Sequence, residues 1–398
     1  MTKEDRLNNA NKHCFYISVN DSGSELCKAN AKYGIAAIHF IQQKLGLKPD
    51  ASFIGTPDMT ITRNTTRWKS GFGYGGKITW GGGKDEFVIL NVKPNACGML
   101  VGGIEEIPDA VDLINRIHDL EASQTYLDGI KIEWDFYKSN HFIDIFLVKP
   151  LSDGGTAFSP YAFIIHGSAC EFTNDNNLGY GLYIDKSSKL QEQAESMDTP
   201  FGKFYFLTGE AAEEYYKRFK YIEDFTKKKR VLAAKKLFGD FINISNESHQ
   251  ALINPNEMIL GCNYHQADDQ LFPLTLRGDL PAYLVKGVQS LSPECIEALG
   301  FEKRAKTLGI YDRLLNANIF PHGGGYNLPD VLSVNRVIEI GKERYFDVEM
   351  HNDRGKKIIS EVRELPFEYR GRTVVLRALE INLFEIAAKL IPQYVFKI

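Results

Sequence analysis

The grouping of strand-like and helix-like segments constrains the fold of this chain more than any other sequence feature. Three segments rich in β-branched and aromatic residues, IKIEWDF, HFIDIFLV and YAFIIH, follow one another between residues 130 and 166. A helical, basic stretch then runs from about residue 209 to 241. Because strict alternation of strand and helix is missing, an α+β class is favoured over α/β.

The expected organisation is one large compact unit with mixed sheets, since 398 residues can bury a large core. We expect residues 1–50 to form an N-terminal helical extension and residues 51–398 to form the main domain. The basic stretch at about 209–241 is expected to be a helical insertion into that domain.

Local patterns predict further elements. Apolar residues at helical spacing predict helices at residues 24–46 and 107–123, and a strand is expected at 86–92. In the C-terminal third, strands are expected at residues 334–341, 344–350 and 372–379. An amphipathic helix is expected at residues 379–391, ended by Pro392.

Composition indicates a globular protein, with 43% hydrophobic and 25% charged residues. No apolar run is long enough to span a bilayer, and the first residues are too polar for a signal peptide, so a cytoplasmic location is expected. The net charge of −4 gives no global sign of a nucleic-acid partner. Two short basic runs, KRFK at 217–220 and KKKR at 227–230, form either a surface for RNA phosphates or a solvated helix face.

Potential metal ligands stand at the ends of strand-like segments. Cys97 follows one such segment, His141 opens another and His166 ends a third, and together they form a plausible three-ligand set for a transition metal. Cys262 also follows an apolar run. His249, in a polar loop-like run, is expected to be structural or solvated.

The segment PHGGGY places His322 directly before three glycines. Glycines in series indicate a tight bend or a surface that something must approach closely. An ordinary surface turn that carries a histidine is the alternative interpretation.

Taken in order, several of these stretches resemble the RtcB-type RNA ligases, from about residue 55 to the C-terminus. The similar segments are TPDM, NACGM, SNHFIDI, IIHGS, GCNY, PHGGGY, LPFEYRG and the C-terminal end. The resemblance implies metal ligands at Cys97, His141, His166 and Cys262, catalytic roles for His322 and Asp58, and nucleotide contacts from Asn140, Asp144, Asn263, Tyr369 and Lys397.

The resemblance also implies an activity. His322 would attack the α-phosphate of GTP and carry GMP, which then activates an RNA 3′-phosphate for joining to a 5′-hydroxyl end. The family uses manganese ions and opens 2′,3′-cyclic phosphate ends first. We therefore expect GTP and Mn²⁺ as cofactors, RNA with broken ends as the partner, and a monomeric protein.

Departures from the family pattern lie mainly at a second metal site. Pro94 stands where the family has a ligand Asp, Cys262 where it has a His, and Tyr326 where it has an Arg. Asp144 is a shorter carboxylate than the family's Glu, and His265 is a candidate substitute ligand. A non-catalytic RNA-end binding protein is therefore the main alternative, and a metal-dependent enzyme of different phosphoryl chemistry is a third.

Overall fold

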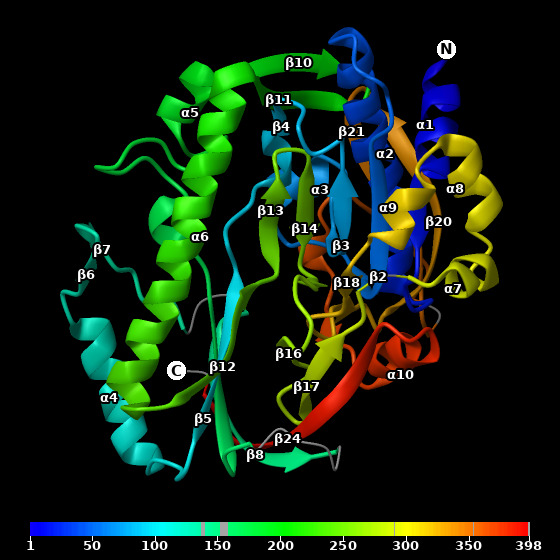
Figure 1. Cartoon of the computed structure of the whole chain (residues 1–398). Helices are drawn as coiled ribbons and strands as arrows, with labels where there is room; N and C mark the ends of the chain where they lie inside the picture. Colours follow the sequence, from blue (N-terminus) through cyan, green and yellow to red (C-terminus); the bar gives the residue numbers. More distant parts are fainter. Residues whose placement is uncertain (137–139, 152–157, 290, 353, 397–398) are drawn as a thin grey trace.

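The structure is a computed structural model. It describes all of the chain except residues 137–139, 152–157, 290, 353 and 397–398. Its mixture of helices and several separate sheets is an α+β fold, as the sequence predicts (Figure 1). No helix in the described residues is long and apolar enough to cross a membrane.

The largest sheet has seven strands, and all neighbouring strands in it are antiparallel. In spatial order they are β12 (Ile242–Ser248), β5 (Gly98–Ile104), β9 (Tyr161–Gly167), β8 (Phe142–Pro150), β24 (Phe384–Phe396), β17 (Ala282–Gly287) and β16 (Leu271–Leu274). Strands β8 and β9 confirm two of the segments expected from the sequence.

A second sheet has five strands, and only its β1–β2 pair is parallel. In spatial order they are β1 (Cys14–Tyr16), β2 (Ser52–Thr60), β3 (Tyr74–Thr79), β14 (Glu257–Leu260) and β13 (Gln250–Asn254). Because β1 belongs to the N-terminal fifty residues, that segment contributes a strand to a sheet of the main unit.

The remaining strands of the described residues form five smaller sheets. Two have three strands: β10 (Glu195–Thr199), β11 (Gly202–Thr208) and β4 (Phe87–Ile89); and β20 (Val331–Ile340), β21 (Glu343–Met350) and β22 (Lys356–Ile359). Three are pairs: β15 (Asn263–Tyr264) with β18 (Ile319–Phe320), β19 (Tyr326–Asn327) with β23 (Glu368–Tyr369), and β6 (Tyr126–Leu127) with β7 (Ile130–Lys131).

Ten α-helices lie in the described residues. They are α1 (Lys3–Lys12), α2 (Ser22–Lys44), α3 (Thr65–Lys69), α4 (Ala110–Ala122), α5 (Ser188–Gln193), α6 (Gly209–Phe238), α7 (Pro293–Ala298), α8 (Glu302–Leu308), α9 (Tyr311–Leu315) and α10 (Thr373–Glu380). Helix α2 begins at a capping box formed by Asp21 and Ser24 and buries the predicted stripe of Ile35, Ile38 and Ile41.

Helix α6 is the predicted basic helix, and it runs along one side of the molecule (Figure 1). It buries Phe219, Ile222 and Phe225, each fully inaccessible to solvent, against the rest of the protein. Its apolar face is therefore part of the main hydrophobic core.

Two expectations for the C-terminal region are wrong. Residues 372–379, expected to be a strand, form α10, which buries Val374, Val375 and Ala378 on one face. Residues 379–391, expected to be a helix ended by Pro392, instead lead into strand β24, which continues through Pro392. Strand β24 pairs with β17 on one side and β8 on the other, so pairing along two edges outweighs the local helical pattern.

The segment IKIEWDF is also mostly irregular, with only the two residues of β7 in a strand. Its side chains are nevertheless buried at Ile130, Ile132, Trp134 and Phe136. These side chains are thus buried because they pack against the core, although the segment does not belong to a large sheet.

Candidate active site and metal cluster

Four neighbouring strands of the seven-stranded sheet bring polar side chains to one edge. Strand β9 ends beside the start of β5, with Gly98 opposite Gly167, and beside the start of β8, with Phe142 opposite His166. Cys97 directly precedes β5, and His141 directly precedes β8. The structure therefore brings Cys97, His141 and His166 close together, because each strand ends where its antiparallel neighbour starts.

His249 joins this cluster from a fourth strand. Strand β12 pairs with β5 so that Ser248 lies opposite Gly98, and His249 follows Ser248 in the chain. Its imidazole is 3% exposed, so burial excludes the solvated role that was one of the two expected for it. The sequence around it is polar, and only the pairing of β12 with β5 reveals its position.

The atoms that converge are the Sγ of Cys97 and one ring nitrogen from each of two histidines. The Nε2 atom of His166 lies 3.0 Å from Cys97 Sγ and 3.3 Å from His249 Nε2. All three ligand atoms lie within 4.8 Å of one another. The set of three that the structure assembles is therefore Cys97, His166 and His249, with His249 in the place expected for His141.

Hydrogen bonds and burial keep these imidazoles in the neutral form that can bind a metal. The Nδ1 of His166 lies 3.0 Å from the backbone oxygen of Asn140, which can only accept, so Nδ1 carries the hydrogen and Nε2 presents a lone pair. Burial holds the pKa values of His166 and His249 well below the ordinary value, and the neutral rings are the form that binds metal. A thiol and two neutral imidazoles fit a divalent transition metal with room for further ligands.

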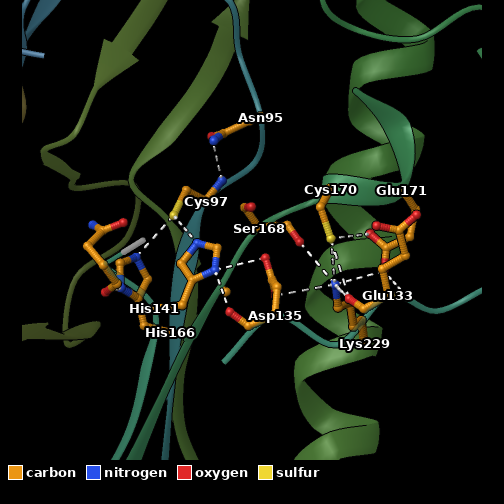
Figure 2. A network of polar contacts seen from close by, with 12 residues as sticks. Asn95, Cys97, Glu133, Asp135, His141, His166, Ser168, Cys170, Glu171 and Lys229 are labelled. Atoms are coloured by element: carbon orange, nitrogen blue, oxygen red, sulfur yellow. Dashed lines mark hydrogen bonds and ion pairs between the residues drawn. The ribbon is translucent and has the colours of Figure 1, made fainter. Parts of the chain in front are cut away.

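His141 lies beside this cluster and is held by a buried ion-pair network (Figure 2). Its Nε2 is 3.8 Å from Cys97 Sγ, and its Nδ1 is 2.8 Å from the carboxylate of Asp135. Burial opposes protonation of His141, but hydrogen bonds with Asp135 and Cys97 raise its pKa to about 10. Asp135 was not singled out from the sequence.

Helix α6 contributes a buried lysine to that network. The Nζ of Lys229 lies 2.7 Å from a carboxylate oxygen of Glu171 and 3.8 Å from one of Asp135, and all three side chains are buried (Figure 2). Lys229 also donates to the backbone oxygens of Glu133 and Ser168 at 2.7 and 3.2 Å. The cation on α6 therefore neutralises the carboxylate that orients His141.

Most charges of the basic runs on α6 are buried or paired within the protein, and RNA contact by this helix stays a prediction. Lys229 and Arg230 are buried in the interior. Four other lysines of these runs form ion pairs with nearby carboxylates: Lys217 with Glu213, Lys220 with Glu223, Lys227 with Glu247, and Lys228 with Asp224. Their charges are thus largely compensated within the protein.

Asp58 and His322 form a second polar unit next to the cluster. The Nδ1 of His322 lies 2.9 Å from Asp58 Oδ2, which also accepts from the backbone nitrogens of His322 and Gly323 at 3.1 and 3.3 Å. Asp58 Oδ1 accepts from Thr56 at 2.6 Å. The carboxylate is fully buried, and its contact with Nδ1 leaves the Nε2 of His322 as the free nitrogen.

The three glycines after His322 are required by neighbouring protein backbone. A Cβ on Gly324 would lie 2.5 Å from the backbone oxygen of Arg370, and one on Gly325 would lie 2.4 Å from that of Asp58. Gly325 also has a φ of 64°. The turn therefore holds His322 against the strand that carries Asp58.

A cavity of about 610 Å³ connects the two units. Cys97, His166, His249 and His322 all line it, and the rings of His249 and His322 are 4.4 Å apart between centroids. The predicted nucleotide-contact residues Asn140, Asp144 and Tyr369 line the same cavity. Lys397 lies outside the described residues.

Two other predicted residues lie elsewhere. The thiol of Cys262 donates to the backbone oxygen of Gly76 at 3.3 Å inside the hydrophobic core, and burial raises its pKa well above the ordinary value. Asn263 donates to the backbone oxygens of Pro273 and Pro321 at 3.2 and 3.0 Å, so it supports the chain just before His322. Neither residue lines the cavity, and His265 does not line it either.

The segment that would carry the missing ligand Asp has a different role here. The side-chain oxygen of Asn95, next to Pro94, accepts from the backbone nitrogen of Cys97 at 3.1 Å. Ala96, between them, has a φ of 53°. Asn95 therefore stabilises the tight turn that carries Cys97. Pro94 has no side-chain atom that could bind a metal.

No model of a known protein family matches this chain, and a search of curated proteins finds no match either. The interpretation of the site consequently depends on its geometry.

Proposed function

We propose that this protein is a metal-dependent nucleotidyltransferase that joins RNA ends through a histidine–GMP intermediate, using GTP and manganese. The observation that carries the proposal is the free Nε2 of His322, which lines the same cavity as the Cys97, His166 and His249 cluster. The resemblance of the sequence to RtcB-type RNA ligases agrees with this assignment of His322 as the nucleophile.

In the proposed reaction, the lone pair of His322 Nε2 attacks the α-phosphorus of GTP. A P–N bond forms, the bond from the α-phosphorus to the bridging oxygen breaks, and pyrophosphate leaves. Asp58 holds the hydrogen on Nδ1 and stabilises the positive charge that the ring acquires on attack. The buried position of Asp58 fixes the ring orientation before the substrate arrives.

Cys97, His166 and His249 would hold the divalent metal ion. Such an ion, when bound, neutralises charge on phosphate oxygens. A thiolate and imidazoles are softer ligands than manganese prefers, so phosphate and water oxygens would complete its coordination.

One observation favours a second candidate function. In the described part of the chain, the group of three ligands contains no carboxylate, and Pro94 supplies none. A protein with this cluster could bind RNA ends through the metal without transferring a nucleotide.

An incubation with GTP that carries ³²P in its α-phosphate distinguishes the two candidate functions. We expect the wild-type chain with manganese to retain the label through a denaturing gel, and His322→Ala to retain none. Asp58→Asn should lower the rate of labelling by at least about 100-fold, because the ring loses its charged orienting partner. His118→Ala, on the exposed face of α4, is the matched control and should label normally. Absence of label in the wild type, with RNA-end binding intact, would favour the binding protein.

A further inference from the structure

A second cavity, of about 460 Å³, lies beside helix α3. It is bounded by α3, by the turn between β10 and β11, and by the turn between β20 and β21. Its lining shares no residue with that of the central cavity. The two are nevertheless adjacent, since Asn64 lines the central cavity and Thr65 lines the second one.

Positive charge dominates the lining of the second cavity. Its charged residues are Lys69, Lys203, Lys342 and Arg344, against Asp185 and Glu343. Asp185 is already neutralised, because its carboxylate lies 2.8 Å from the Nζ of Lys93, outside this lining. Lys69 is paired with Glu343 of the same lining at 3.4 Å, and Lys342 is paired with Asp198 at 2.6 Å, so the positive charge left without a carboxylate in the described part of the chain is that of Lys203 and Arg344.

Two of these cations have no carboxylate oxygen within 4.0 Å among the described residues, namely Lys203 and Arg344. Arg344 is only 7% exposed, and its guanidinium donates to the backbone oxygens of Lys69 and Phe201. The guanidinium of Arg344 also lies 4.7 Å from the centroid of the Tyr33 ring. A buried cation without a carboxylate partner is stabilised when an anion binds close to it. Lys203 is exposed and is free to reach such an anion.

The same lining includes one partly exposed aromatic ring, that of Tyr205. Trp68 and Phe346, which pack with their ring centroids 5.2 Å apart, and Phe204 are at most 2% exposed and belong to the buried wall of the cavity. The indole Nε1 of Trp68 is buried without a hydrogen-bond partner in the described part of the chain. A partly exposed tyrosine ring beside cations that have no carboxylate partner among the described residues fits a ligand that combines a planar base with a phosphate.

We infer that the second cavity binds a phosphate-bearing nucleotide of a single-stranded RNA. This nucleotide lies beyond α3 when the end of the same RNA occupies the central cavity. This inference rests on the proposed function for the identity of the strand. Lys203 and Arg344 contact the phosphate, and the ring of Tyr205 contacts the base. A free mononucleotide has the same chemistry and is the other source of such a ligand.

Binding is measured with the full-length His322→Ala protein in EDTA, so that neither nucleotide transfer nor metal-bound phosphate contributes. The probes are a fluorescent single-stranded RNA with a 3′-phosphate, followed by anisotropy, and GMP, followed by calorimetry. We expect Lys203→Glu to weaken RNA binding about tenfold and to reduce its salt dependence. Lys303→Glu, the same charge reversal at an exposed site on α8, should leave binding unchanged.

Equal affinities of the Lys203→Glu and Lys303→Glu proteins for both probes would overturn the site. Weakened binding of GMP alone would support the nucleotide site and overturn its assignment to an RNA strand. The ligase proposal is tested separately by the labelling of wild-type His322. Failure of that labelling, with RNA binding still sensitive to Lys203→Glu, would overturn the ligase and leave the site in place.

Discussion

At the level of single residues, hydrogen bonds decide which atoms of the cluster are available. His166 donates from Nδ1 to the backbone of Asn140, and His322 donates from Nδ1 to Asp58. Both rings therefore present Nε2 to the cavity. His141 differs, because its Nδ1 is paired with the carboxylate of Asp135 and its Nε2 approaches Cys97 from beside the cluster.

This difference predicts unequal effects of histidine substitutions on metal binding. His249→Ala should lower the affinity for manganese or zinc by at least about 100-fold, because it removes one of the three candidate ligands. His141→Ala should have a smaller effect, since His141 lies outside the set of three. Isothermal calorimetry on the purified chain provides the affinities and the stoichiometry, expected to be about one ion per chain.

His118→Ala serves as the control for these titrations and should bind metal normally. A larger loss for His141→Ala than for His249→Ala would instead favour the ligand set expected from the sequence.

At the level of elements, helix α6 connects the surface to the candidate metal site. It supplies Lys229, whose charge balances the buried carboxylates of Glu171 and Asp135. Burial opposes the charge on Lys229, but these carboxylates raise its pKa above the ordinary value. The helix therefore stabilises the position of His141 through Asp135.

Lys229→Met tests this role of α6. Methionine retains most of the side-chain volume, but the two carboxylates lose their cation, so the free energy of unfolding should fall by about 3 kcal/mol. Urea unfolding measures that loss. Lys228→Met, one residue earlier, removes a lysine whose ion pair with Asp224 is exposed, and we expect no measurable change. Equal stability of the two variants would show that the buried network does not support the fold.

At the level of the whole molecule, Arg370 joins three distant segments. Its guanidinium binds the carboxylate of Asp21 near the N-terminus, the backbone of Asp58 and Met59 in β2, and the backbone of Gly324 beside His322. The side chain of Arg370 is 2% exposed. The N-terminal fifty residues are thereby linked to the loop that carries the candidate nucleophile.

Asp21→Asn is expected to weaken this link. Asparagine still caps α2, but it leaves the buried charge of Arg370 without a carboxylate, so the free energy of unfolding should fall by about 3 kcal/mol. GMP labelling of His322 should slow as well, because the loop loses part of its support. Asp224→Asn, which breaks an exposed pair, is the matched control. Unchanged stability and labelling in Asp21→Asn would argue against coupling between the N-terminal segment and the site.

The sequence by itself determined the elements whose pattern is local. The stripe of Ile35, Ile38 and Ile41 predicts α2, and β-branched runs predict β8 and β9. The positions of Cys97, His141 and His166 at strand ends also predict their convergence. Periodicity, caps and strand composition are properties of neighbouring residues, so they can be interpreted without knowledge of the fold.

Only the tertiary structure decided the features that depend on distant partners. Residues 384–396 form a strand because β8 and β17 pair along both of their edges. His249 becomes a candidate ligand because β12 lies beside β5. Lys229 is buried because Glu171 and Asp135, far away in sequence, surround its charge. Pairing and burial are energies shared between segments that no local pattern brings together, and they outweigh the propensities of the segments themselves.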